Sequence, residues 1–242
     1  MNRPRLPAGY CPLQLWCRKD EFYRVCILTD ETGDVAGLQI NFPCSDLKPR
    51  FDMRELGFTI WTTSLDDQIV RFYAYFMLFV PPDSQKRIES KDVTVVLRDD
   101  KLYYSGFGGH LASVTTDTSQ LDSTAYVKQE CVTFQGYGHY YNMTEDLECS
   151  ASTLSPFSVS VYRDTLVAAK ITVFGHFKKY SKYFKLFEDL NAVGVKHDVP
   201  TGPDCMFTHI SQYGAVSMTI FFTSTPYNIR CIKHQSTTTT TT

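Results

Sequence analysis

The chain has 242 residues, a length that fits one large all-β domain or two smaller ones. Hydrophobic residues make up 43% and charged residues 21%, which argues against disorder over most of the chain. The net charge of −2 gives no global attraction to nucleic acid or anionic membranes, and no apolar run is long enough for a transmembrane segment.

Aromatic residues make up 14% of the chain and alternate with Val, Thr and Ser, which is typical of β-strands. The predicted strands are 13–17, 22–29, 35–42, 58–64, 68–80, 125–134, 205–210, 215–224 and 227–232, with hairpins at 93–105 and 157–174. This pattern predicts a mainly β fold, an antiparallel β-sandwich-like architecture with one amphipathic helix near the C-terminal third.

The domain organisation follows from the polar and low-complexity stretches. We expect a flexible arm at 1–10 and a disordered Thr-rich tail at 235–242. Between them we expect a single β-rich domain, 11–234, or two lobes joined near 106–122, where Gly, Ser, Thr and Asp are frequent.

Two pairs of segments resemble each other. "VTVVLRDDKLYYSGFGGH" (93–110) and "VSVYRDTLVAAKITVFGH" (159–176) each predict a strand, an Arg-Asp turn and a second strand. "FTIWTTS" (58–64) also resembles "MTIFFTS" (218–224). We interpret the hairpins as framework and leave an old duplication open.

An amphipathic helix is predicted over 177–190, with Gly194 as its C-terminal cap. Its apolar stripe comprises Phe177, Tyr180, Phe184, Phe187 and Leu190. Its other faces carry Lys178, Lys179, Lys182 and Lys185. These lysines could contact phosphate, anionic lipid or an acidic partner, and nucleic acid is expected only through them. The alternative is a surface helix with solvated lysines that covers one sheet face.

Two loops place a methionine among acids. "FDMREL" surrounds Met53, and "NMTEDLE" contains Met143, Glu145 and Asp146. An exposed thioether between carboxylates can anchor in an apolar pocket with a basic rim, so both loops are candidate partner-binding sites.

No catalytic motif is found. The Gly-rich loop from Ser105 to His110 could cradle a phosphate, but it lacks the Walker and dinucleotide patterns. Cys205, His209, Cys231 and His234 have ligand types that suit zinc, but three-residue spacing on a strand points two of them to opposite faces. We therefore expect no metal, no cofactor and no enzymatic activity.

The eight cysteines leave two alternatives. No secretory signal is evident at the N-terminus, so we expect reduced thiols and an intracellular protein, in the cytoplasm or nucleus. The even number also fits a disulfide framework, which would indicate an extracellular protein.

The segment "LGFTIWTTSLDDQIVRFYAYFMLFVPPD" resembles the dUTPase-related proteins of gammaherpesviruses: a Thr-rich strand, a long aromatic strand and an acidic turn. This resemblance implies a β-rich fold descended from duplicated dUTPase domains, with catalysis lost and binding to host factors retained. The glycines of the dUTPase nucleotide motif are missing around "VYRDTL" (161–166), which agrees with lost activity.

The function expected from these observations is a non-catalytic interaction module. With the resemblance, it would be a viral modulator of host innate-immune signalling, gene expression or RNA export, with a host protein as partner. One alternative is a nucleotide-binding, dUTPase-like hydrolase. The other is a secreted, disulfide-bonded β-sandwich that binds an extracellular ligand.

Overall fold

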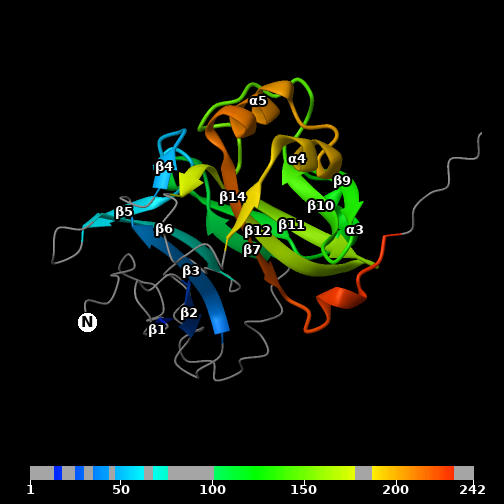
Figure 1. The fold of residues 1–242 in the computed structure, drawn as a ribbon. Helices are drawn as coiled ribbons and strands as arrows, with labels where there is room; N and C mark the ends of the chain where they lie inside the picture. The colour runs from blue at the N-terminus through cyan, green and yellow to red at the C-terminus, as the bar shows by residue number, and fades with distance from the viewer. Residues whose placement is uncertain are drawn as a thin grey trace, which may run out of the picture.

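Two antiparallel sheets of seven strands each form the framework of the protein (Figure 1). The computed structural model describes residues 14–17, 25–29, 35–43, 47–62, 68–75, 101–177 and 187–231. The predicted mainly β, antiparallel architecture is confirmed.

The first sheet has the order β1-β2-β3-β6-β7-β8, and β5 pairs with β6. Its strands are β1 (Gln14–Cys17), β2 (Val25–Thr29), β3 (Val35–Pro43), β5 (Thr59–Thr62), β6 (Gln68–Tyr75), β7 (Lys101–Ser105) and β8 (Leu111–Thr115). The expected hairpin at 93–105 falls mostly outside the described residues. Only its second strand, β7, is described, and it pairs with β6 and β8.

The second sheet has the order β13-β14-β12-β11-β10-β9, and β4 pairs with β12. Its strands are β4 (Leu47–Pro49), β9 (Tyr126–Val132), β10 (Gly136–Tyr141), β11 (Phe157–Tyr162), β12 (Thr165–Phe177), β13 (Glu188–Leu190) and β14 (Ala215–Phe221). The hairpin predicted at 157–174 is confirmed as β11 and β12. Its turn residues Arg163 and Asp164 have φ values of 49° and 57°, as a two-residue hairpin turn requires.

The main core lies between the two sheets. Ile40, Leu102 and Val114 of the first sheet belong to one buried cluster with residues of the second, such as Ile171. Tyr104 of β7 stacks on Phe157 of β11, with ring centroids 4.2 Å apart. Side chains from both sheets therefore bury one another, as in a sandwich.

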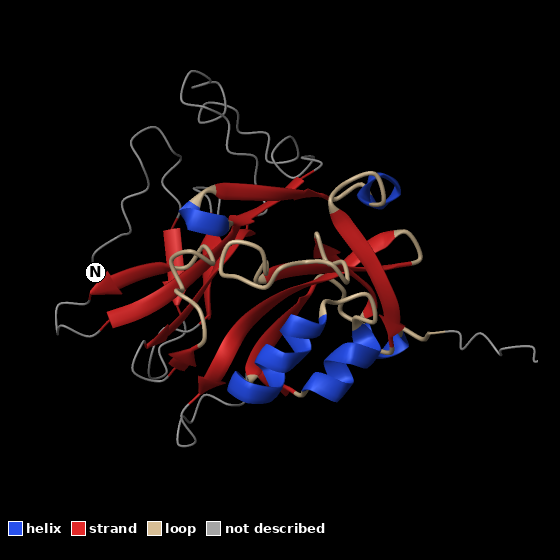
Figure 2. Ribbon diagram, turned by 90° about the horizontal axis from the view of Figure 1, so that it is seen from above, coloured by secondary structure: helices blue, strands red, loops and turns tan. Residues whose placement is uncertain are grey.

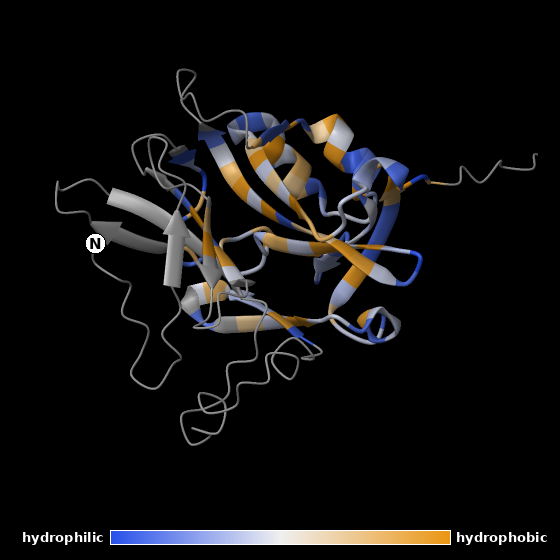
Figure 3. Ribbon diagram, turned by 90° about the horizontal axis from the view of Figure 1, so that it is seen from below, coloured by the Kyte–Doolittle hydropathy of each residue, from blue (hydrophilic) through white to orange (hydrophobic). Residues whose placement is uncertain are grey.

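A second core lies between the second sheet and two helices, α4 (Ala192–Asp198) and α5 (Asp204–Tyr213). Figure 2 shows these helices side by side against the strands. In Figure 3, hydrophobic residues are frequent on the strands and helices that border this layer. Its buried members are Met143, Leu154, Phe174, Val199, Met206, Phe207, Ile210 and Ala215. The shorter elements are α3 (Thr118–Leu121), η2 (Phe107–Gly109) and η3 (Pro226–Asn228).

The prediction of a strand at 205–210 was wrong, because these residues form α5. Pro203 and Asp204 begin the helix, and Gly214 ends it with φ of 74°. Met206, Phe207 and Ile210 are buried on one side, at helical spacing.

The helix predicted over 177–190 is contradicted at both ends. Phe177 is the last residue of β12, and Glu188–Leu190 is β13, which pairs with β14. Phe187 packs into the core between the sheets. Gly194 lies inside α4, whose N-cap Asn191 accepts a bond from the Gly194 amide at 2.7 Å. The four lysines, Lys178, Lys179, Lys182 and Lys185, lie outside the described residues.

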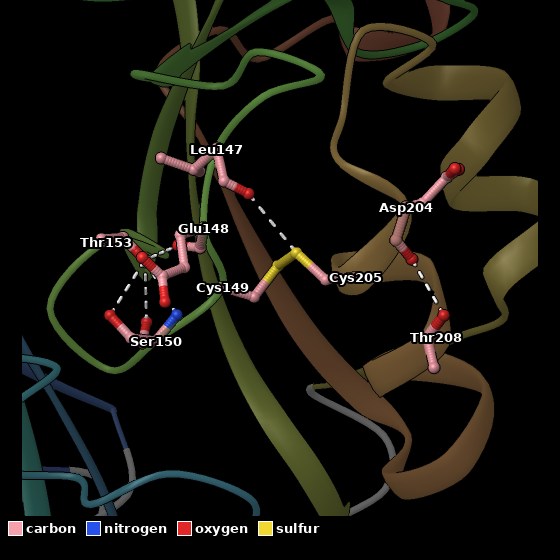
Figure 4. The surroundings of a disulfide bond; sticks show 8 residues. All are labelled: Leu147, Glu148, Cys149, Ser150, Thr153, Asp204, Cys205 and Thr208. Atoms are coloured by element: carbon pink, nitrogen blue, oxygen red, sulfur yellow. Dashed lines mark hydrogen bonds between the residues drawn. A yellow bond between two sulfur atoms is a disulfide. The ribbon is translucent and has the colours of Figure 1, made fainter.

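Disulfides overturn the expectation of reduced thiols. Cys131 is bonded to Cys231, and Cys149 to Cys205; Cys26 is also disulfide-bonded. The Cys149–Cys205 disulfide links the loop after β10 to the start of α5 (Figure 4). The Cys205 sulfur lies 3.4 Å from the carbonyl oxygen of Leu147. The sequence alone could not predict which cysteines are bonded, because the bonded partners are 100 and 56 residues apart.

None of the helices in the described ranges is both long and apolar enough to cross a membrane.

Candidate protein-binding surface

The chain after β14 crosses one end of the second sheet, from β14 to β9 (Figure 1). We call residues 222–231 the C-terminal strap. At its start, the Phe222 amide donates to the Val167 carbonyl of β12 at 2.8 Å. At its end, Cys231 is bonded to Cys131 of β9. The strap is therefore anchored on both sides of the sheet end.

Two further bonds hold the strap just before Cys231. The Tyr162 hydroxyl of β11 donates to the Arg230 carbonyl at 3.2 Å. The Phe134 amide, in the turn between β9 and β10, donates to the Ile229 carbonyl at 3.2 Å. Ile229 is 3% exposed, so it pins the strap against the sheet.

The strap and the two hairpin turns together present aromatic and arginine side chains. We define the hairpin-end surface as Phe134, Tyr162, Arg163, Phe222, Tyr227 and Arg230. Phe134, Phe222 and Tyr227 are 48%, 41% and 60% exposed. Aromatic rings and arginines are the side chains that contribute most binding energy in protein interfaces.

The arginines are stacked on rings. The Arg230 guanidinium carbon lies 4.9 Å from the centroid of the Phe134 ring, and that of Arg163 lies 5.2 Å from the centroid of the Tyr162 ring. A guanidinium over a ring keeps N–H donors at its edge for acceptors. One of these donors, Nη1 of Arg230, donates to the Ile229 carbonyl at 3.4 Å. The surface therefore combines apolar area with oriented cationic donors.

Phe134 has an unfavourable backbone conformation. Its φ is 72°, in the left-handed region that a bulky side chain rarely adopts. Strain of this kind costs on the order of 1 kcal/mol or more, and it is concentrated at functional sites. An Asn at this position would relieve the strain and lose the ring, so the ring itself is the feature to test.

The predicted methionine anchors are corrected. Met53 is 4% exposed and Met143 is 3% exposed, and both pack in the cores. Neither thioether can anchor a partner, because hydrophobic packing draws both inward. Glu145 and Asp146 are exposed, in the turn that follows Met143.

The Gly-rich loop from Ser105 to His110 is not arranged as a phosphate cradle. The amide of Gly106 donates to the His110 carbonyl at 2.7 Å, and that of Gly108 donates to the Glu55 carbonyl at 2.8 Å. These donors are satisfied within the chain, and His110 is exposed. The residues with zinc-ligand character are also separated. Cys205 and Cys231 belong to different disulfides, and His234 lies outside the described residues.

One buried titratable group has an acidic neighbour. His139 of β10 is 3% exposed; its Nδ1 lies 3.1 Å from the Tyr137 carbonyl oxygen and its Nε2 lies 3.8 Å from an Asp122 carboxylate oxygen. Burial lowers the pKa of His139 despite this carboxylate. The fold therefore favours the neutral form of His139 more than water does.

The hairpin-end surface was missed by sequence reasoning. Its residues come from three segments that are far apart along the chain, and the disulfide and strap that assemble them are tertiary features. The Arg-Asp turn was recognised, but only as framework.

No known protein family, no characterised protein and no solved structure matches this chain.

Proposed function

We propose that the protein is a non-catalytic interaction module, braced by disulfides for an oxidising compartment, and that it binds a protein partner through the hairpin-end surface. The observation that carries this proposal is the exposed Phe134 ring, held in a strained conformation beneath Arg230 at the end of a rigid sheet.

The partner's chemistry follows from the charges of this surface. Arg163 and Arg230 are exposed, and Asp164 is the single carboxylate in the same turn. A complementary partner offers an apolar side chain to the rings and carboxylates to the guanidinium edges. A protein segment with an apolar residue flanked by acids meets both conditions.

The cysteines distinguish the alternatives for location. Disulfides persist in oxidising environments and are rare in the cytoplasm and nucleus. They support the alternative of a secreted β-sandwich with an extracellular ligand over the cytoplasmic or nuclear location. Under the resemblance to gammaherpesvirus proteins, the partner would be a host protein met outside the cell or in the secretory pathway.

The test is binding of the labelled, oxidised protein to intact cells, measured by flow cytometry. Phe134→Asn removes the ring and suits the left-handed backbone, so it should fold at least as well as the unaltered protein. We expect this variant, and Tyr227→Ser, to lose at least about tenfold in apparent affinity.

Val193→Ser is the matched control, because Val193 is 82% exposed on α4, outside the hairpin-end surface. It should bind as the unaltered protein does, and trypsin treatment of the cells should abolish binding. Equal binding by Phe134→Asn, or no binding to any cell type tested, would contradict the proposal.

A further inference from the structure

A group of basic side chains lies away from the hairpin-end surface, where β4 meets the C-terminal end of α5. Lys48 of β4 lies directly opposite His176 of β12 in the strand register. Two residues on, the Arg50 amide donates to the Phe174 carbonyl at 2.9 Å. Lys48, Arg50 and His176 are all exposed.

Helix α5 contributes rings to the same place. The Arg50 guanidinium carbon lies 4.6 Å from the centroid of the Tyr213 ring and 5.4 Å from that of Phe51. The His209 ring lies edge-on to Phe51, with centroids 5.1 Å apart. The guanidinium is thus positioned by two rings, and its edge is free of contact with them.

The His176 ring lies beside Gly214, at the C-terminal end of α5. A Cβ on Gly214 would lie 2.1 Å from the His176 ring, so a side chain at this position would displace the imidazole from the end of α5. Gly214 also has φ of 74°, which glycine tolerates best. The sequence therefore keeps a space for the imidazole beside the helix end.

Among the described residues, no carboxylate neutralises the positive charge of Lys48 and Arg50. Within the described ranges, neither Lys48 nor Arg50 forms an ion pair, although Asp52 and Glu55 are near in the chain. The C-terminal end of a helix supplies about half a negative charge, which is less than the two full charges of Lys48 and Arg50. A positive excess remains.

The pKa of His209 responds to the positive charge of Arg50. Its Nδ1 is buried and has no hydrogen-bond partner among the described residues. Burial lowers the pKa of His209, and the positive charge of Arg50 lowers it further. A bound anion would offset the effect of Arg50.

We infer that Lys48, Arg50 and His176 form a binding site for a tetrahedral oxyanion, a sulfate or phosphate group carried by a ligand. Arg50 offers paired N–H donors to its oxygens, and Lys48 adds a point charge about 7 Å farther along the strand. The site is independent of the hairpin-end surface, so either can fail without the other.

The experiment follows the His209 imidazole by NMR while pH is varied, in sodium sulfate, in sodium phosphate, and in sodium chloride of equal ionic strength. We expect sulfate or phosphate to raise the pKa of His209 and chloride to leave it lower, because only a bound oxyanion neutralises Arg50 locally. His197, which is exposed and lies 3.1 Å from the Asp198 carboxylate, is the reference imidazole.

The variants separate binding from general screening. Arg50→Gln should raise the pKa of His209 before any anion is added and remove the further rise. It should also weaken oxyanion binding at least about tenfold, because the paired charge-assisted hydrogen bonds of the guanidinium are lost. Lys48→Gln should weaken binding while the starting pKa of His209 changes little. Lys101→Gln, an exposed lysine on β7, should change neither.

A heparin-derived tetrasaccharide and a nucleoside triphosphate identify the carrier, because the natural ligand's class should bind tighter than either inorganic ion. Equal responses in sulfate, phosphate and chloride would overturn the inference. So would binding that survives both Arg50→Gln and Lys48→Gln.

Discussion

The hydroxyl pair between Tyr104 and Tyr126 gives the sharpest test of how the two sheets are joined. The two oxygens lie 2.7 Å apart, and the residues are 4% and 5% exposed. The Ser155 side chain acts to lower the pKa of Tyr104, against the larger effect of burial, and it has no such effect on Tyr126. The two hydroxyls are therefore unequal.

Removing each hydroxyl should have a different cost. Tyr104→Phe keeps the stack on Phe157 but leaves the Tyr126 hydroxyl buried without a partner, which costs about 1–3 kcal/mol. Tyr126→Phe leaves the Tyr104 hydroxyl with Ser155 as a replacement partner, so it should cost about 1 kcal/mol or less. In the double variant no hydroxyl of the pair is orphaned, so the two effects should not add.

Urea unfolding of the oxidised protein measures these differences, and thermal melting checks them. Each kcal/mol corresponds to a Tm change of about 2–4 °C for a chain of this size. Equal costs for the two single variants, or a double variant equal to their sum, would refute the reasoning.

Three other predictions concern pH and the disulfides. Burial raises the pKa of Tyr104 and Tyr126, so the folded protein keeps protons that the unfolded chain loses above about pH 10. The free energy of unfolding should therefore fall as pH rises above this value, by up to about 1.4 kcal/mol per pH unit per tyrosine. Urea titrations at alkaline pH should show a smaller slope for Tyr126→Phe. Because burial lowers the pKa of His139, the unfolded chain binds a proton at this histidine more readily than the folded protein does below about pH 6.5. The free energy of unfolding should therefore fall as pH drops below that value, and calorimetry of His139→Gln should show a weaker dependence of Tm on pH. Replacing Cys131 and Cys231 by Ser should lower the free energy of unfolding by about 4 kcal/mol and remove the hydrogen-exchange protection of the Phe134 amide. In the matched control, replacing Cys149 and Cys205 by Ser, the Phe134 amide should stay protected.

The strand predictions that succeeded rest on residue patterns within a single hairpin. The hairpin of β11 and β12 was predictable because an Arg-Asp turn separates two aromatic and β-branched runs, and neighbouring strands need no distant information to pair. The same logic failed at α5. Its sequence, DCMFTHISQY, is short and mixed in propensity, so residues 205–210 were interpreted as a strand.

Long-range contacts decided the rest. Phe187 has helical spacing with its neighbours, yet the core between the sheets takes its side chain, and the next residues pair with β14. Neither the disulfide partners nor the meeting of Phe134 with Arg230 can be read from spacing, because each depends on the completed second sheet.

Strand β4 has a consequence for cutting the chain. It comes from the N-terminal half, yet it pairs with the end of β12, and a Cβ on Gly175 would lie 2.4 Å from the Lys48 carbonyl oxygen. A fragment that begins after β8 would lack both this strand and the first sheet, so it would expose the end of β12 and the second sheet's side of the main core, which favours aggregation. The complementary piece that ends after β8 carries β4 and the first sheet, so we expect the two pieces to be soluble only when they are folded together.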